Sequence, residues 1–466
     1  MSRTLERFGI RHGREIFSLA APTVLTMLSH TLMWTVDSAF LGHVSSLALA
    51  AAGLGGMITW TCYTVFNALS RVTSTFVSQA NGRGDDRAVA DYTWQGIYVS
   101  LLTGVVLVVA GQWSYIILRW TGNAPEIQAA SYVYIKYRML SALGTQLIMC
   151  LTGFFNGRKD VRTPMIAGIT ANLLNVVLDY FMIFGHGPFP AMGLKGAAIA
   201  TSIAVYVNAS ILVGWMIVPR AVRERYRMIR PRRPSLRKIM DMTRIGMPAS
   251  VGDFIDMVGF TVFSALIGRA GTASLAASQI TIQILSFSFM PLWGLTVAAT
   301  VLVGNQIGAG DPDRAERHGN EAYLVCIYYV AFLAAVISLF GKEVFHIFTG
   351  DPAVIALAGG LVLAAAIFQI FDGLRMIGLG VLQGAGDTRY PMVIALVVLL
   401  GFFVPATYYA IEVRGGTVSH AWFVGCVSYL LMAGWIYARY RTGRWRTMAI
   451  FSEGYEESTM ELSGLE

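Results

Sequence analysis

Long stretches without a charged residue run through most of this chain. A membrane-spanning helix needs about 20 largely apolar residues, and nine stretches free of Asp, Glu, Lys and Arg approach or exceed that length. They are residues 38–70, 96–118, 139–157, 196–219, 270–310, 322–341, 352–371, 390–411 and 415–438. This succession predicts a multi-span helical membrane protein, because the lipid interior requires each spanning segment to satisfy its own backbone hydrogen bonds.

Composition excludes the main alternatives. Charged residues make up 13% of the 466 residues, whereas soluble proteins usually carry about 25%. Apolar residues make up 55% and the mean hydropathy is +0.58, which also excludes a disordered chain. Three further apolar segments contain a few charged residues each: 15–38, 162–185 and 239–266. Together these segments predict an all-α integral membrane fold of twelve transmembrane helices.

The distribution of Lys and Arg predicts the direction in which the chain crosses the membrane. Cytoplasmic loops are enriched in these residues. If the N-terminus is cytoplasmic, the connections on the outer side hold only five bases: Arg119, Lys195, Arg269, Lys342 and Arg414. Most of the other bases fall in the inner connections and termini. We therefore expect a multi-pass protein of the cell (inner) membrane with both termini in the cytoplasm.

A basic segment follows the sixth predicted helix. Nine of the 35 Lys and Arg residues lie between Arg220 and Lys238. Such a patch could bind nucleic acid, but its position next to a membrane helix favours a topology-determining linker that contacts anionic lipid. We therefore expect membrane lipid, and no nucleic acid, as a partner.

The two halves of the chain repeat one another. At an offset of 226 residues, one motif recurs: Gly82, Gly84 and Asp85 as Gly308, Gly310 and Asp311. At an offset of 227, a second recurs: Gly157, Asp160, Arg162 and Pro164 as Gly384, Asp387, Arg389 and Pro391. The repeat predicts four regions: an N-lobe at 1–219, the linker at 220–238, a C-lobe at 239–446 and a disordered acidic tail at 447–466.

Duplication of six helices has a functional implication. An even number of spans gives both lobes the same orientation, related by a pseudo-two-fold axis along the membrane normal. In such proteins the substrate site lies near the bilayer midplane between the repeats, and rocking opens it to each side in turn. In the repeated Gly-Arg-Gly-Asp and Gly-Ala-Gly-Asp turns, glycine permits positive φ, and the acid could either cap the next helix or hold a neighbouring arginine.

Five acids fall within the predicted helices: Asp37, Asp179, Asp253, Asp256 and Asp372. An ionisable residue at the bilayer centre costs about 2.5–3.5 kcal/mol on insertion scales and usually marks an ion path or an ion pair. We expect Asp37 to end the first helix and Asp179 to lie in the fifth. The other three lie in the seventh and tenth helices, so each lobe carries its own carboxylates.

The fifth predicted helix has a polar face. Asn172, Asn175 and Asp179 are spaced i, i+3, i+7, which places two amides and a carboxylate on one side. Oxygen ligands of this kind suit Na⁺, and the carboxylate could instead carry a proton. The alternative is interhelical hydrogen bonding by the two amides.

The C-lobe acids allow two interpretations. Asp253 and Asp256 face the same way, and either could meet Asp372 if the seventh and tenth helices are neighbours. Arg375, however, follows Asp372 by one helical turn. An i, i+3 ion pair between them would keep Asp372 permanently charged and give it a structural role.

Several short motifs occur in an order typical of one transporter family. They are Ala21-Pro22, Val36-Asp37-Ser38, Gln79 to Asp85, Asn175 to Asp179, Gly196 to Thr201, and Gly380 to Asp387. With these motifs the duplicated chain resembles the multidrug and toxic compound extrusion (MATE) family over almost its whole length, and most closely its NorM-like branch. The resemblance implies a V-shaped, twelve-helix antiporter that exports cationic, amphipathic compounds in exchange for Na⁺ or H⁺.

The resemblance also implies site residues. In the N-lobe, Asp37, Asn175, Asp179 and Thr201 match the family's cation site, with Na⁺ possible at the first three. In the C-lobe, two acids match those typical of the NorM-like branch: Asp256 and Asp372. Two positions depart from that branch, since Asp256 stands where Glu is commoner and Phe368 where Tyr is expected. These departures weaken the case for a C-lobe sodium site.

Other functions stay open at this point. A flippase for lipid-linked precursors belongs to the same wider superfamily and would need a strongly basic cavity, whereas the predicted helices carry few bases. A membrane-embedded enzyme would need catalytic motifs, and GxSxG and HExxH are missing from the sequence. We expect no cofactor besides the coupling ion. We also expect a monomer, because two lobes can complete a transport path within one chain.

Overall fold

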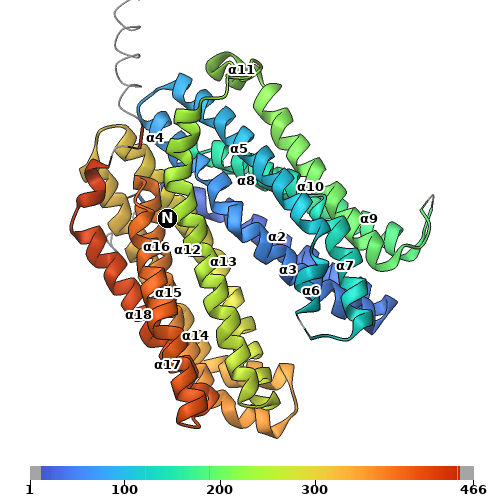
Figure 1. Ribbon diagram of the computed structural model, residues 1–466. Helices are drawn as coiled ribbons and strands as arrows, with labels where there is room; N and C mark the ends of the chain where they lie inside the picture. The colour runs from blue at the N-terminus through green and yellow to red at the C-terminus, as the bar shows by residue number, and fades with distance from the viewer. Residues whose placement is uncertain (1–11, 121, 188, 449, 452–466) are drawn as a thin grey trace, which may run out of the picture. The chain divides into compact units, whose positions relative to one another are not determined.

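The computed structural model describes residues 12–120, 122–187, 189–448 and 450–451. The regular elements in these ranges are helices (Figure 1). Those of the first half are α2 (Gly13–Val44), α3 (Ser46–Arg71), α4 (Thr73–Gly82), α5 (Asp86–Gln112), α6 (Tyr115–Arg119), α7 (Pro125–Met139), α8 (Ala142–Gly157), α9 (Arg162–Phe184), α10 (Gly193–Ile217) and α11 (Arg220–Tyr226). Those of the second half are α12 (Leu236–Arg269), α13 (Thr272–Gly308), α14 (Pro312–Phe348), α15 (Pro352–Ala385), α16 (Arg389–Ala395), the π-helix η1 (Leu396–Phe403), α17 (Val404–Tyr408), the π-helix η2 (Tyr409–Val413), α18 (Val418–Arg441) and the 3₁₀-helix η3 (Arg444–Thr447). The predicted all-α class is confirmed.

The described residues contain eleven or twelve candidate membrane spans, judged by length and composition. Eleven are long and apolar enough to cross a bilayer by themselves, including the continuous pair Ser46–Gly82 and the run Arg389–Val413. The twelfth is the broken pair α7 and α8, whose axes differ by 47°. If this pair is one span, the number of candidate spans equals the predicted twelve.

The first helix is longer than the sequence predicts. We expected it to end at Asp37, but α2 continues to Val44. The break comes at Ser45, which has an extended backbone (φ −171°, ψ 156°) and accepts a hydrogen bond on its hydroxyl from the amide of Ala48 at 3.0 Å. This serine is the N-cap of α3. The prediction that Asp37 ends the helix is wrong because a capping serine, and not a charge, separates the two helices.

Contacts divide the helices into two units. Unit 1 comprises Met1–Val24 with Val251–Met448, and unit 2 comprises Leu25–Ser250 with Ala449–Glu466. Two helices contribute to both units, because α2 changes unit after Val24 and α12 after Ser250. Each change falls two residues after an intrahelical proline, Pro22 or Pro248. The predicted lobes follow the sequence repeat, whereas these units follow contacts.

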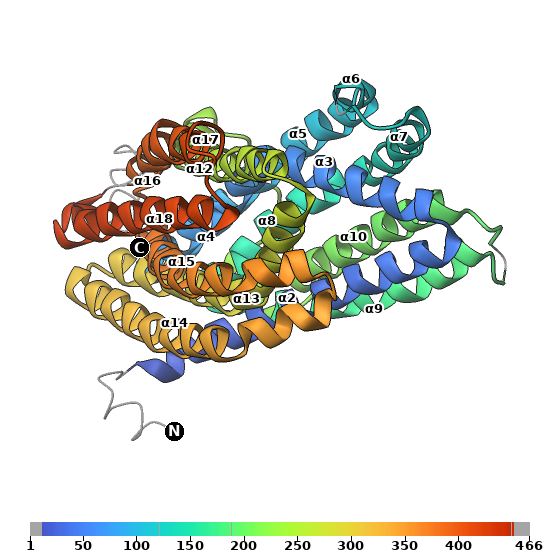
Figure 2. The same cartoon turned by 90° about the horizontal axis from the view of Figure 1, so that it is seen from below.

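In unit 1, the long helices α13, α14 and α15 pack side by side, with α18 against α15 (Figures 1 and 2). If the chain crosses the membrane back and forth, every second connection lies on the same side. Ion pairs join helix ends that lie on the same side in this scheme. They are Arg439–Asp387 (2.7 Å) and Arg446–Asp313 (3.2 Å) at one end and Arg269–Glu412 (3.4 Å) at the other. The order in which the chain threads through unit 1 therefore agrees with the predicted alternation.

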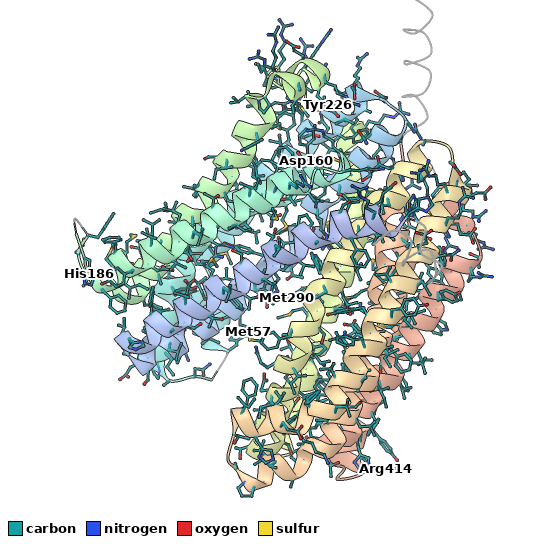
Figure 3. All side chains as sticks on the ribbon, turned by 180° about the vertical axis from the view of Figure 1, so that it is seen from behind. Met57, Asp160, His186, Tyr226, Met290 and Arg414 are labelled. Carbon is teal, nitrogen blue, oxygen red and sulfur yellow. The ribbon has the colours of Figure 1, made fainter. Side chains whose placement is uncertain are left out.

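Unit 2 shows the same alternation. Its helices α9 and α10 pack together, and α8 packs against α4 and α5. Figure 3 shows Asp160 and Tyr226 at one end of this unit and His186 at the opposite end. Asp160 and Tyr226 follow the fourth and sixth spans, and His186 follows the fifth. Their positions agree with a chain that crosses back and forth.

The repeated glycine-acid turns adopt the same conformation in both halves. Gly84 and Gly310 each have φ of 74°, in the left-handed region that favours glycine. The carboxylates of Asp85 and Asp311 each accept a hydrogen bond at 2.8 Å from the amide three residues further on. Both acids are therefore N-caps, of α5 and α14, which is the first of the two roles that the sequence allowed.

The second repeated motif has diverged. Asp160 accepts hydrogen bonds from the backbone amide and the hydroxyl of Thr163, at 3.2 and 2.8 Å. Its counterpart Asp387 instead accepts a hydrogen bond at 2.7 Å from Nε of Arg439, on α18. The same sequence motif thus caps a helix in unit 2 and connects two helices in unit 1.

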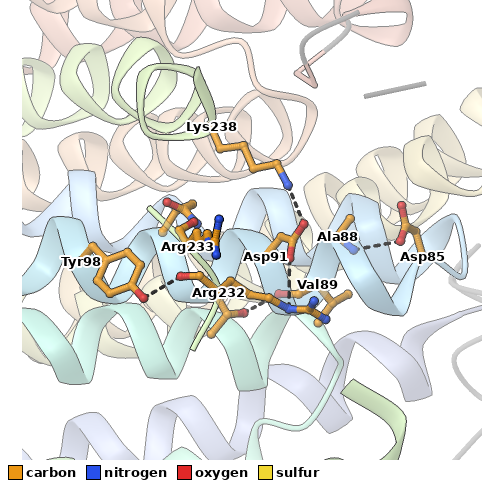
Figure 4. Close-up of polar contacts among 10 residues, drawn as sticks. Asp85, Ala88, Val89, Asp91, Tyr98, Arg232, Arg233 and Lys238 are labelled. Atoms are coloured by element: carbon orange, nitrogen blue, oxygen red, sulfur yellow. Dashed lines mark hydrogen bonds and ion pairs between the residues drawn. The ribbon is translucent and has the colours of Figure 1, made fainter. Parts of the chain in front are cut away.

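The basic linker is docked on α5 within unit 2 (Figure 4). Nζ of Lys238 lies 2.5 Å from the Asp91 carboxylate, and Nε of Arg232 lies 3.3 Å from the same group. The hydroxyl of Tyr98 donates to the carbonyl of Arg232 at 2.6 Å. Seven other linker arginines are exposed: Arg220, Arg223, Arg225, Arg227, Arg230, Arg233 and Arg237. Asp91 thus holds two bases of the linker, while most of the linker's charge stays at the surface.

Asp91→Asn is expected to loosen the linker. The substitution removes the carboxylate that Lys238 and Arg232 share, and the side chain of Asp91 is only 10% exposed, so solvent screens this interaction weakly. We expect faster trypsin cleavage within residues 220–238 of the detergent-solubilised protein. Asp86→Asn is the matched control, because its partner Arg225 is 53% exposed. Equal cleavage rates in the two variants would contradict this account of the linker.

The described part of the C-terminal segment packs against unit 2. Phe451 is buried, with its ring 5.3 Å from that of Tyr92 and 5.9 Å from that of Phe76. The guanidinium of Arg83 lies 4.4 Å from the same ring. The tail predicted to be disordered begins at 447, and its residues 449 and 452–466 lie outside the described part of the chain.

Candidate functional site

Two acids from different helices meet inside unit 2. The carboxyl groups of Asp37, on α2, and Asp179, on α9, are close enough to interact with each other. Asp179 is fully buried, and neither of its oxygens receives a hydrogen bond. Oδ1 of Asp37 is likewise buried without a donor. Two neighbouring carboxylates repel when both are ionised, so this pair favours binding of a cation or a proton.

The polar face of α9 is only partly directed at this pair. Asn175 is fully buried, interacts with Asp179 one turn away, and has no hydrogen-bond partner for its amide oxygen or nitrogen. Asn172 instead donates to the hydroxyl of Ser29, on α2, at 2.9 Å. Asn175 therefore keeps an oxygen available for a cation, whereas Asn172 makes the interhelical hydrogen bond that was the alternative interpretation.

Thr201, on α10, has a different local partner. Its side chain is buried, and its hydroxyl donates to the carbonyl of Ala197 in the same helix at 2.8 Å. That bond uses the proton of the hydroxyl and leaves oxygen lone pairs. The structure thus brings Asp37, Asn175 and Asp179 together and gives Thr201 a hydrogen bond within its own helix.

Two residues of α7 belong to this site and were missed by the sequence analysis. The hydroxyl of Tyr134 interacts electrostatically with both carboxylates and with Arg138. The charge of Arg138 also acts on Asp37, while its guanidinium donates to the hydroxyls of Ser141 and, at 3.4 Å, Tyr63. Arg138 was not among the candidate site residues predicted from the sequence. The sequence could have indicated this residue, because a charged arginine inside a bilayer costs free energy and is as exceptional there as an acid.

The break between α7 and α8 positions this arginine. Ser141 lies between the two helices and donates its hydroxyl to the carbonyl of Arg138 at 2.7 Å. Gly55 of α3 leaves room for Tyr134, because a Cβ there would come within 2.8 Å of the tyrosine ring. The local sequence therefore directs the polar side chains of a broken helix toward the acid pair.

The C-lobe acids are held differently, within unit 1. Arg375 donates from Nε and Nη2 to Oδ1 of Asp372 at 3.1 and 2.8 Å, and from Nη1 to Oδ2 of Asp256 at 2.9 Å. The i, i+3 pair that the sequence allowed is therefore present, and the same guanidinium brings α12 and α15 together. Asp253 interacts electrostatically with Asp256. All three predicted acids thus lie near one another around a fixed positive charge.

Aromatic rings complete the C-lobe cluster. The guanidinium of Arg375 lies 4.9 Å from the ring centroid of Tyr429, on α18. Phe368 packs against that ring at 4.3 Å and against Trp422 at 5.7 Å. Phe368 therefore serves as a packing residue, and it brings no hydroxyl to the acids.

Among the residues that the structure describes, no group of three or more His, Cys, Asp or Glu side chains is placed to hold a metal ion. The set considered for Na⁺ in the N-lobe contains two acids and one amide: Asp37, Asp179 and Asn175. Its role as an ion site remains a prediction.

Comparison with known families decides the identity of the fold. A family model described as MatE matches residues 22–181 and 248–409, one segment in each half of the chain. The chain belongs to the MatE family. The match confirms the predicted resemblance.

Curated MatE relatives span the whole chain. A probable multidrug resistance protein NorM from Thermotoga maritima is 28% identical over 94% of this chain and 94% of its own length. Multidrug resistance protein PmpM from Pseudomonas aeruginosa is 29% identical over 85% of this chain and 83% of its own. Their names support the NorM-like branch of the MatE family.

Solved structures show the same MatE fold. One, described as the outward-facing conformation of a multidrug resistance MATE family transporter of the MOP superfamily, gives a TM-score of 0.83 at 21% identity and covers 92% of this chain and 96% of that one. A MOP superfamily transporter from Pyrococcus furiosus gives 0.82 at 20% identity, over 93% and 96%. At these identities the likeness concerns the fold alone.

Proposed function

We propose that this MatE protein is a secondary active multidrug efflux antiporter. It exports cationic, amphipathic compounds across the cell (inner) membrane in exchange for Na⁺ or H⁺, with both termini in the cytoplasm. The names of the curated relatives support multidrug export. The predicted distribution of Lys and Arg supports the orientation.

The interaction between Asp37 and Asp179 carries this proposal. Their carboxyl groups are close, and the oxygens of Asp179 are buried without hydrogen-bond donors. Two ionised carboxylates beside one another attract a cation, and a coupling ion and a cationic substrate would compete for that role. Uptake of the ion then favours release of the substrate, and loss of the ion favours its capture. Differential binding of this kind couples the two fluxes.

The ion gradient is sufficient for useful accumulation. Exchange of one singly charged substrate for one Na⁺ or H⁺ moves no net charge, so the concentration gradient of the ion drives it and the membrane potential does not. A tenfold ion gradient is worth about 1.4 kcal/mol and sustains about a tenfold substrate gradient. A second coupling ion per substrate would add the membrane potential, about 2.3 kcal/mol per 100 mV.

Apolar side chains of unit 2 suit an amphipathic substrate. Trp34, Met57 and Trp60 are each about half exposed, on α2 and α3 (Figure 3 labels Met57). Methionine and tryptophan offer polarisable, adaptable contacts to flat molecules of different shapes. These contacts would add to the electrostatic attraction of the acids for a cation.

The test is ethidium efflux from cells expressing the protein, with imposed Na⁺ and pH gradients varied independently. We expect efflux that requires one of these gradients and stops when that gradient is collapsed. Efflux that is independent of both gradients would overturn exchange, and no efflux under any gradient would favour a flippase for lipid-linked precursors. A membrane-embedded enzyme would convert a substrate without moving it, so the assay also separates that alternative.

A further inference from the structure

The acid cluster of unit 1 already contains a cation that belongs to the protein. The side chain of Arg375 is 8% exposed, and those of Asp256 and Asp372 are 27% and 14% exposed. Three hydrogen bonds of 2.8–3.1 Å connect this guanidinium to one oxygen of each carboxylate. Because the two acids come from α12 and α15, the guanidinium occupies the space where carboxylates of different helices converge.

That arrangement competes directly with an alkali cation. Na⁺ is a hard cation that needs several converging oxygens, and carboxylates are its best protein ligands. Here one oxygen of each carboxylate already accepts hydrogen bonds from the guanidinium. A sodium ion on the remaining oxygens would lie next to a positive charge that cannot be released, since arginine does not deprotonate in proteins.

The surroundings hold the guanidinium in place. The ring of Tyr429 lies 4.9 Å from it, and Phe368 packs against that ring. Phe368 also lacks the hydroxyl that the family resemblance leads one to expect at this position. The cluster thus contains the guanidinium of Arg375 as its own cation, and Phe368 contributes no hydroxyl oxygen to it.

We propose that Arg375 is a built-in counter-cation that prevents Asp256 and Asp372 from binding Na⁺, and so acts as an ion-specificity residue of the C-lobe. If the proposed antiport is correct, it follows that the coupling ion binds at the N-lobe acids. Only this consequence rests on the proposed function. The binding claim itself concerns residues of unit 1 alone.

The experiment measures ²²Na⁺ binding to the purified full-length protein at pH 8, on a background in which Asp37 and Asp179 are both changed to Asn. With Arg375 intact, we expect no saturable site that depends on Asp372. Arg375→Met, which is neutral and unbranched, should create one saturable site whose affinity for Na⁺ is at least about tenfold above any residual binding by the parent. Adding Asp372→Asn should abolish this site. Arg375→Lys keeps the charge and should create no site.

Two results would overturn the inference. One is saturable Na⁺ binding in the parent that disappears on Asp372→Asn, a comparison that is valid even if Arg375→Met fails to fold. The other is folded Arg375→Met protein without a new site. Failure of the proposed antiport would appear separately, as missing gradient-driven efflux in the unmodified protein, and would leave these binding results unchanged.

Discussion

Asp179→Asn is expected to abolish gradient-driven ethidium efflux, to the level of cells without the protein. The substitution is nearly isosteric, so the packing of α9 should persist, but the amide carries no negative charge and does not take up a proton. Asp179 is fully buried and lies beside Asp37. The pair therefore loses the charge that attracts either the coupling ion or a cationic substrate.

The matched control for this loss is Asp313→Asn. Asp313 is also an acid of a long helix, but its side chain is 74% exposed and pairs with Arg446 at the end of α14. Its loss should leave efflux unchanged, because it lies outside the acid pair. Protein amounts in the membrane are compared by immunoblot. Efflux retained by Asp179→Asn at equal expression would remove Asp179 from the mechanism.

Asp387→Ala is expected to cause the largest loss of stability, by about 3 kcal/mol. Asp387 is 3% exposed and accepts a hydrogen bond from Nε of Arg439 at 2.7 Å. The substitution leaves a largely buried guanidinium without its counter-charge, which costs far more than the net value of the pair. We expect a clear fall in the thermal unfolding midpoint of the detergent-purified protein.

Asp313→Ala again provides the comparison, because its pair with Arg446 lies at the surface. Exposed ion pairs contribute about 0–1 kcal/mol, so this variant should unfold near the midpoint of the unmodified protein. Similar midpoints for Asp387→Ala and Asp313→Ala would show that burial of the Arg439 pair has no energetic consequence, contrary to this account.

Much of the fold follows from local sequence features. Uncharged runs give the spans, and the repeated Gly-x-Gly-Asp turns give matching caps at Asp85 and Asp311. The end of α2 was misplaced because charge served as the stop signal, whereas Ser45 supplies it. The end of such a helix can be predicted from the sequence if capping residues are given more weight than charged residues.

The candidate site shows where sequence reasoning ends. The pair of Asp372 and Arg375 follows from helical periodicity, since the two residues are one turn apart. The third partner, Asp256, depends on how α12 and α15 pack, which no spacing encodes. Arg138 was recognisable as an intramembrane charge, but its nearness to Asp37 depends on the bend between α7 and α8.

The most direct test of the central claim follows both fluxes in proteoliposomes. An imposed ethidium gradient should drive an opposite flux of one ion, read as ²²Na⁺ movement or as an internal pH change. This account predicts that the counterflux is lost in both Asp37→Asn and Asp179→Asn while the Asp313→Asn control retains it. Ethidium movement without any ion counterflux, or a counterflux that persists in Asp179→Asn, would contradict the claim that the N-lobe acid pair couples the two.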